Sequence, residues 1–269
     1  MSTLSRMMRL DRSRFVWQQM KVQFRVRALR WFSFGLIVTQ PVIFSAVGYF
    51  LARAAGKTQI DLIHTIIGSG VMGLWSTLLF SSFFDLRADR REGTLELLVG
   101  SPTSIFAILS VRTFTNVLLG SLSFLLSLIV ALFVFGFSTP LRNLPFILIS
   151  LAVLFFAFWC LGLFLAHWPV VSRLSGLFIN YLELPIGILT GFMFPISLLP
   201  GWAQWLALFT PMVWAFNGVS ESFQGADPTI LWRNWLMALA VSCLYLIVTI
   251  FMSRRVQDMI RVTGELSSQ

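Results

Sequence analysis

Six long apolar runs are spaced along the chain and separated by shorter polar stretches. They cover residues 31–52, 62–84, 105–137, 144–167, 174–194 and 230–253. A helix that rises 1.5 Å per residue needs about 20 residues to cross a hydrocarbon core of ~30 Å. Each run therefore predicts one transmembrane helix. The third run is longer than one crossing needs, so its first turns around Arg112 are expected to lie in the interface.

The composition agrees with this pattern. Of the 269 residues, 57% are hydrophobic and 12% are charged, and the mean hydropathy is +0.82. This is too apolar for a soluble domain. Cys160 and Cys243 fall inside predicted spans without a His or Cys at ligand spacing, so neither a disulfide framework nor a metal site is expected. The sequence predicts an all-α polytopic membrane protein whose six spans occupy residues 31–253.

The basic residues gather on one side of the predicted membrane. With a cytoplasmic N-terminus, sixteen of the twenty Lys and Arg residues are cytoplasmic, eight of them within residues 1–30. The four outside are Arg53, Lys57, Arg142 and Arg233. This distribution follows the positive-inside rule, and six spans return the tail, residues 254–269, to the cytoplasm. The formal charge of +9 is then matched by anionic lipid headgroups, and no nucleic-acid partner is expected.

Residues 1–30 predict an amphipathic helix that lies in the cytoplasmic interface. On a helical wheel one side holds Arg14, Gln18, Lys21 and Arg25, and another holds Val16, Trp17, Met20 and Phe24. The alternative is a disordered basic tail that sets only the orientation.

The cytoplasmic stretch 85–101 alternates acidic and basic residues and then becomes apolar. Its charged positions, which allow i,i+3 and i,i+4 pairing, are Asp89, Arg90, Arg91, Glu92 and Glu96. Leu95 and Leu98 form an apolar edge, and Gly100 with Pro102 is expected to end the helix. A short charged helix of this kind is suited to docking on another protein, and the alternative is a solvated loop.

The segment 195–227, between the fifth and sixth runs, is predicted to lie outside. Pro195, Pro200 and Pro211 divide it into pieces too short to cross, and Trp202 and Trp205 indicate headgroup depth. We expect short re-entrant or interfacial helices here, which are tolerated where they are buried in protein or line a wet cavity. The segment is a candidate lid over an exit path.

Glu183 is an ionisable residue inside the fifth predicted span. A carboxylate there costs roughly 2.5–3.5 kcal/mol, so it should face protein or water. Gly187 and Gly191 follow at one-turn intervals, which is the spacing of closely packed helices. Two interpretations stay open. The stripe lines a translocation path or subunit interface, or Glu183 is protonated and bonded to its neighbours.

The sequence contains no catalytic motif. Gly56-Lys57-Thr58 resembles the end of a phosphate-binding loop, but Leu51 stands where such a loop needs its first glycine. His64 and His167 have no acid or cysteine at ligand spacing. We therefore expect no enzyme activity and no cofactor on this chain, and any ATP chemistry must come from a partner.

With these features in order, the chain resembles the permease subunit of type-2 ABC exporters, which move polysaccharides, lipids and drugs. Two stretches carry the resemblance. One runs Arg91-Glu92-Gly93-Thr94-Leu95-Glu96-Leu97-Leu98, similar to the family's coupling helix, and the other is Gly191-Phe192-Met193-Phe194-Pro195 with Leu199-Pro200 and Thr210-Pro211. The resemblance implies a second permease subunit, identical or related, and a cytoplasmic ABC ATPase that binds ATP and Mg and grips the coupling helix.

The resemblance also implies a bacterial inner-membrane location and a path between the first and fifth spans of two subunits. Two other classes of membrane protein would leave different signals in the sequence. A secondary transporter or channel without ATP would be expected to carry ionisable residues in several spans and an inverted repeat, and the sequence shows neither. A membrane-bound lipid enzyme would need a polar catalytic cluster, and the sequence contains none.

Overall fold

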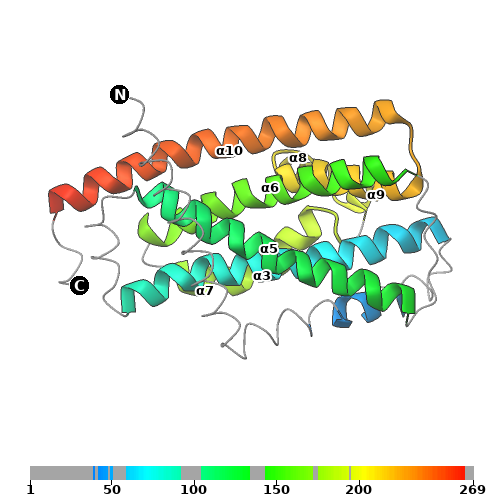
Figure 1. Ribbon diagram of the computed structural model, residues 1–269, viewed down its shortest axis with the longest axis horizontal. Helices are drawn as coiled ribbons and strands as arrows, with labels where there is room; N and C mark the ends of the chain where they lie inside the picture. The colour runs from blue at the N-terminus through cyan, green and yellow to red at the C-terminus, as the bar shows by residue number, and fades with distance from the viewer. Residues whose placement is uncertain are drawn as a thin grey trace, which may run out of the picture.

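A computed structural model of the chain describes residues 39, 42–47, 49–50, 59–91, 104–133, 143–171, 175–193 and 195–263. These residues form helices joined by turns, and none of them lies in a strand. The elements are α3 (Gln59–Arg91), α5 (Ile105–Phe133), α6 (Leu144–Val171), α7 (Ser175–Leu189), the 3-10 helix η1 (Ile196–Leu198), α8 (Gly201–Leu208), α9 (Pro211–Gln224) and α10 (Pro228–Thr263). Residues 42–47 are also helical. The long helices α3, α5, α6 and α10 run along the long axis of the molecule (Figure 1).

Four of the described helices, α3, α5, α6 and α10, are long and apolar enough to cross a membrane. Ile105 and Leu144, where α5 and α6 begin, are also the first residues of the predicted third and fourth spans. The predicted sixth span lies within α10, which continues to Thr263 and so includes much of the predicted tail. The predicted interface helix 1–30 and most of the predicted first span lie outside the described residues.

The fifth predicted span corresponds to a shorter helix than the sequence indicated. α7 has 15 residues and ends at Leu189, so it is about 22 Å long and shorter than the ~30 Å hydrocarbon core. The run to residue 194 is apolar throughout, but its last residues turn back into the protein instead of continuing the helix.

α3 is the central helix of the bundle and contacts α5, α6, α7 and α9. Within its apolar stretch 83% of the residues are buried, against 22% for α10. The two values distinguish a helix enclosed by the chain, α3, from one that lies mostly exposed on the outside of the bundle, α10. Because α3 is enclosed, it can carry small and hydroxyl residues that let neighbouring helices approach closely, and it is the least apolar of the four spans.

Buried hydroxyl groups join α3 to its neighbours. The Oγ atoms of Ser45, Ser69 and Ser127 lie within 3.2 Å of one another and share hydrogen bonds. Further along, Asn116 Nδ2 of α5 donates to Ser82 Oγ of α3 over 3.2 Å. The contacts pair α3 with α5 in antiparallel register. Hydrogen bonds of this kind between helices in a membrane contribute about 0.6 kcal/mol each.

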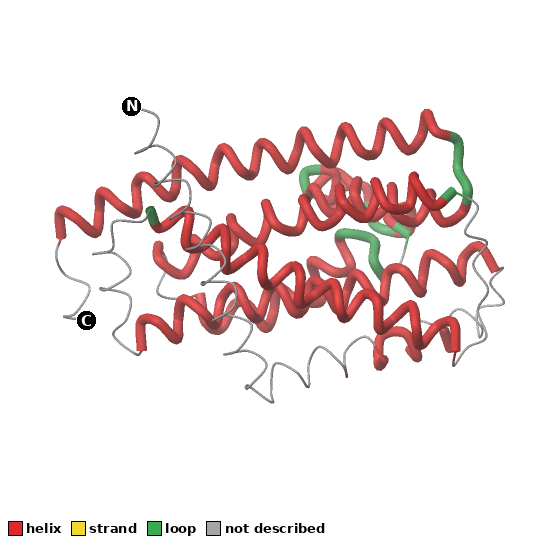
Figure 2. The backbone as a smooth tube through the Cα atoms, in the orientation of Figure 1, coloured by secondary structure: helices red, strands yellow, loops and turns green. Residues whose placement is uncertain are grey.

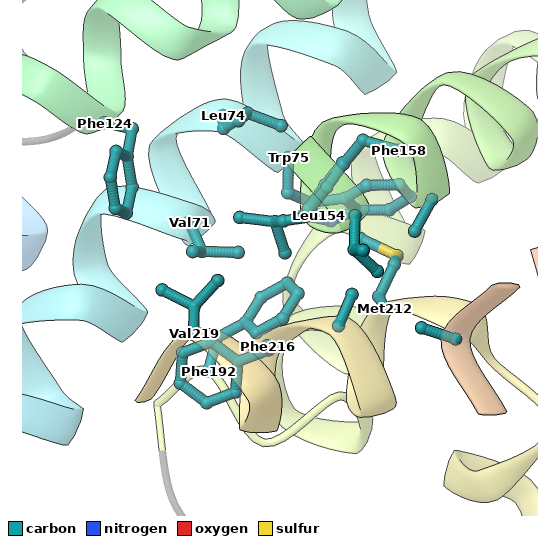
Figure 3. Packing of buried hydrophobic residues seen from close by; sticks show 14 of the residues in the cluster. Val71, Leu74, Trp75, Phe124, Leu154, Phe158, Phe192, Met212, Phe216 and Val219 are labelled. Carbon is teal, nitrogen blue, oxygen red and sulfur yellow. The ribbon is translucent and has the colours of Figure 1, made fainter. Parts of the chain in front are cut away.

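The main hydrophobic core lies where α3, α6 and α9 meet. Trp75, Phe158, Phe192 and Phe216 are among its largest fully buried side chains. Figure 3 shows these rings converging from different segments of the chain. The turn after α7 contributes Phe192, so this turn is part of the core.

Candidate functional site

Glu183 is held by α3. The Ser76 hydroxyl donates a hydrogen bond to Glu183 Oε1, and Trp75 Nε1 donates to the backbone carbonyl oxygen of Glu183 over 3.2 Å. Ser76 and Trp75 are fully buried, whereas Glu183 is partly exposed. The Glu183 side chain is therefore fixed to the central helix of the bundle through Oε1.

Gly187 lies against the same central helix. A Cβ atom built on Gly187 would stand 2.6 Å from the sulfur of Met72, so a larger residue would fit here only if the end of this flexible side chain moved. The sequence had suggested that this glycine packs against another helix, at a path or at a subunit interface. Its observed neighbour is α3 of its own chain.

Gly191 has a role different from the predicted one. It lies beyond the end of α7 and has φ 79°, a left-handed conformation that glycine adopts without strain. Its N–H donates to Ile188 O over 3.1 Å, and the Phe192 N–H donates to Gly187 O over 3.3 Å. These two bonds form a Schellman cap. Gly187 and Gly191 are therefore not one helix face, because the second glycine ends the helix.

The turn that follows this cap is locked into the bundle at Phe192. Its ring stacks on Phe158 with centroids 6.2 Å apart and meets Phe216 edge-on at 5.2 Å. The backbone of Phe192 also passes so close to Gly68 of α3 that a Cβ there would lie 1.8 Å from the Phe192 carbonyl oxygen. We call residues 190–193 the Phe192 turn. It joins α7 to α3, α6 and α9.

Each predicted proline in the segment 195–227 begins a helix. Pro195 and Pro200 are the N-cap residues of η1 and α8, and Pro211 is the first residue of α9. The N–H groups at a helix start have no partner within the helix, and proline removes one of them. Figure 2 shows the short turns between these elements in green.

The two helices of this segment differ in burial. α9 buries ten of its residues, among them Met212, Phe216 and Phe223, in the core. α8 buries only Ala203 and Ala207, and its two tryptophans, Trp202 and Trp205, are 68% and 70% exposed. The predicted lid therefore has two different parts. α9 belongs to the packed core, and η1 and α8 lie on the surface of the bundle.

Hydrogen bonds hold α9 between α6 and α10. Ser150 Oγ of α6 donates to Gly218 O over 3.1 Å and accepts a hydrogen bond from Trp235 Nε1 over 2.9 Å. At the end of α9, Asn234 Nδ2 of α10 donates to Glu221 Oε2. Analysis of the sequence missed Ser76, Glu221 and Asn234. The one available signal was that Glu221 is the first charged residue after a long uncharged stretch.

The predicted coupling residues lie at the edge of the described part of the chain. Arg90 and Arg91 are the last two residues of α3, so the second span and the start of the coupling segment form one continuous helix. Glu92, Gly93, Thr94, Leu95, Glu96 and Leu98 lie outside the described residues. Among those that are described, no group of three or more His, Cys, Asp or Glu is placed to hold a metal ion.

The sequence shows to which family this helical membrane protein belongs. The sequence model described as ABC-2 type transporter matches residues 13–223, well over half of the chain. This chain belongs to the ABC-2 type transporter family. No curated protein sequence matches it significantly.

The family match identifies this ABC-2 type transporter as a membrane permease, a transport component and not a catalytic domain. The match ends at Phe223, in α9, so it includes α3, Glu183, the Phe192 turn, η1, α8 and all but the last residue of α9. Glu221, near the end of α9, is half buried. Burial raises the pKa of Glu221, against the opposing effects of the Arg233 charge and the Asn234 hydrogen bond.

This shift predicts the pH dependence of stability. Because the folded state raises the pKa of Glu221 above its ordinary value of 4.5, ionisation of this group destabilises the folded permease as the pH rises above that value. Glu221→Gln keeps an oxygen acceptor for Asn234 and removes the charge. We expect the variant to melt at the same temperature as the wild type near pH 4 and at a higher temperature at pH 8. Thermal unfolding in detergent at both pH values measures this difference, and an equal Tm at pH 8 would contradict it.

Proposed function

We propose that this permease is the membrane-spanning subunit of an ATP-driven exporter in the bacterial inner membrane. Two permease subunits, identical or related, form the translocation path, and a cytoplasmic ABC ATPase supplies the energy. The observation that carries this proposal is the family match over residues 13–223. It is supported by the lack of any nucleotide-binding loop in the sequence, which requires a partner for ATP hydrolysis.

The position of α3 suggests how the partner would drive transport. α3 has 33 residues, so it is about 50 Å long, and it ends at Arg91, where the predicted coupling segment continues. Along its length it holds Glu183 through Ser76 and contacts the Phe192 turn at Gly68. An ATPase that pushes on the coupling segment would move a rigid helix to which α7 is attached, and this would open the path beside α7.

Reversing the two acids of the coupling segment tests the proposal. The Glu92→Arg/Glu96→Arg variant is expected to insert into the membrane at the wild-type level but to lose ATP-driven export, because two arginines replace the glutamates that would pair with the ATPase. Co-purification of an ATPase subunit with the tagged permease, and export by membrane vesicles, measure the two effects.

A matched control reverses two other acids on the same predicted side. Asp258 and Glu265 lie near the C-terminus, and Asp258→Arg/Glu265→Arg introduces the same change in charge away from the coupling segment. We expect this control to retain the ATPase and export activity. Normal export by the coupling variant, or purification of an active transporter without any ATPase, would refute the proposed function.

A further inference from the structure

α7 contains a proline in its interior. Pro185 lies between the two ends of this helix, where proline is the least favourable residue because it has no N–H to donate and its ring crowds the preceding turn. In a regular α-helix the N–H at this position would bond to the carbonyl oxygen of Tyr181, four residues earlier. The next N–H, that of Ile186, belongs to Leu182 in the same pattern. Pro185 therefore leaves the Tyr181 carbonyl oxygen without its helical donor.

This oxygen lies on the exposed side of α7. Tyr181, Leu184 and Ile188 are 75%, 50% and 36% exposed, and Pro185 is exposed as well. Their spacing of three, four and seven positions places these four residues on one side of the helix, which we call the Tyr181 face. A helical carbonyl group points along the axis toward the residue four positions further on. The Tyr181 oxygen is therefore directed toward Pro185 on this face.

The donors that α3 offers to α7 are used on the opposite side of α7. Gly187 is buried there against Met72 of α3. The side chains of Ser76 and Trp75 both donate to Glu183, one to its carboxylate and the other to its backbone carbonyl. The contact that attaches α7 to the central helix therefore does not supply the Tyr181 oxygen.

The Tyr181 oxygen also lies at membrane depth. Ser76, the hydrogen-bond partner of Glu183, is inside the candidate span His64–Ser82, and Tyr181 is two residues, or about 3 Å, from Glu183 along the helix axis. Hydrocarbon chains contain no hydrogen-bond donor, so a backbone carbonyl is not left unsatisfied against them. The Tyr181 face therefore requires a ligand that carries an N–H or O–H group.

The chemistry of this face favours a cationic donor with an apolar body. A carbonyl oxygen is the negative end of a dipole, and a tyrosine ring attracts cations to its face. Residues 174–220 contain no Lys or Arg that would repel a cation, and their one acidic side chain is Glu183. Leu184 and Ile188 add apolar surface beside the oxygen. A protonated primary or secondary amine on an apolar molecule matches all of these features.

We infer that the Tyr181 face binds the ammonium group of an amphipathic amine through the carbonyl oxygen that Pro185 leaves free. This names the substrate class of the exporter and, in that respect alone, rests on the proposed function. A quaternary ammonium group has the same charge but no N–H, so it binds this oxygen less tightly. An unfavourable residue in a helix is a departure from local rules of the kind that occurs at functional sites, and here Pro185 creates the acceptor.

Equilibrium dialysis with the permease alone in lipid nanodiscs tests this inference. The probes are radiolabelled octylammonium and octyltrimethylammonium, which share a chain and a charge and differ in their N–H donors. Nanodiscs of phosphatidylcholine and phosphatidylglycerol contain no N–H in their headgroups, and empty nanodiscs give the background. We expect saturable binding of octylammonium that is about tenfold tighter than that of octyltrimethylammonium, a difference within the range of one hydrogen bond to a charged group.

The Pro185→Ala variant removes the acceptor without removing a side-chain contact to the ammonium group. It restores an N–H that bonds to the Tyr181 oxygen, so we expect the two probes to bind equally and Tm to rise by several degrees. Tyr181→Phe keeps both the carbonyl group and the ring, and it should bind octylammonium like the wild type. Pro200→Ala, at the start of α8, is the matched control and should leave the preference unchanged.

Two results would overturn the inference. One is a tenfold preference for octylammonium that persists in the Pro185→Ala variant, and the other is the absence of saturable octylammonium binding to the wild type. Adding phosphatidylethanolamine, whose headgroup is a primary ammonium, distinguishes two sources of the ligand. Competition with octylammonium would support a lipid headgroup at this site, and unchanged binding would support a soluble amine.

None of these measurements involves an ATPase. If amine binding fails while an ATPase subunit still co-purifies and export continues, only the inference about the Tyr181 face is lost. If the amine binds as expected but no ATPase partner exists, the proposed function fails and the binding site remains.

Discussion

Replacement of Gly68 by alanine is expected to destabilise the permease by about 3 kcal/mol, the upper part of the range for overpacked cores. The added Cβ would lie 1.8 Å from the carbonyl oxygen of Phe192 and 2.9 Å from its carbonyl carbon. This backbone cannot move aside locally, because the Phe192 N–H is bonded to Gly187 O and its ring is held by Phe158 and Phe216. The clash must therefore displace the whole Phe192 turn.

Thermal unfolding in detergent measures this loss. For a protein of this size about 3 kcal/mol corresponds to a decrease in Tm of about 10 °C. Gly201→Ala is the matched control, since a Cβ there meets nothing within 4 Å, and it should leave Tm unchanged or slightly raise it. Gly162→Ala should fall between the two, because its Cβ would meet side-chain atoms of Thr113 and Leu78, which can shift. Equal melting of the Gly68→Ala and Gly201→Ala variants would disprove the close approach.

The long helices that can span the membrane were predictable because the apolar run that specifies each of them is local in the sequence. A run of apolar residues of sufficient length specifies a span without reference to the rest of the chain. The limits of α7 were not predictable in the same way. Gly187 and Gly191 have the spacing of a helix-packing motif, but glycine also provides the left-handed residue of a helix cap. The Phe192 ring, buried by tertiary contacts, determines which role Gly191 has.

The difference between α8 and α9 was also hidden from the sequence. Both helices are apolar and both contain tryptophan. In a soluble protein the buried face is the apolar one, but in a membrane the lipid-facing surface is equally apolar, so hydropathy does not distinguish the two. The size of the side chains is the better guide, since Ala203 and Ala207 face the protein and Trp202 and Trp205 do not.

The environment of Glu183 could be predicted only in part. The cost of a carboxylate in a span required a protein or aqueous environment, and the hydroxyl of Ser76 is part of that environment. The identity of this partner depends on how α7 packs on α3, and the two residues are far apart in the sequence. Periodicity within one helix contains no information about such a contact.

Glu183→Gln is expected to reduce ATP-driven export about tenfold, equivalent to roughly 1.4 kcal/mol in the barrier, with little change in stability. The amide has the same shape as the carboxylate and keeps an oxygen that accepts the hydrogen bond from Ser76, so packing on α3 is preserved. The change removes the carboxylic acid group, and residues 174–220 contain no other Asp, Glu, Lys or Arg. In the proposed path Glu183 would be the one acidic or basic side chain of residues 174–220 that a substrate meets beside α7.

Three variants separate a transport role for Glu183 from a structural one. Glu221→Gln makes the same chemical change in α9, away from α7, and should leave export unchanged. Ser76→Ala removes the donor to Glu183 and should lower Tm, because a carboxylate within the bundle loses a hydrogen bond. If Glu183→Gln lowers Tm as Ser76→Ala does and export falls in proportion to folded protein, Glu183 serves the fold alone. If export falls while Tm and membrane insertion match the wild type, the charge itself acts in transport, because the hydrogen bond that Gln retains accounts for the stability.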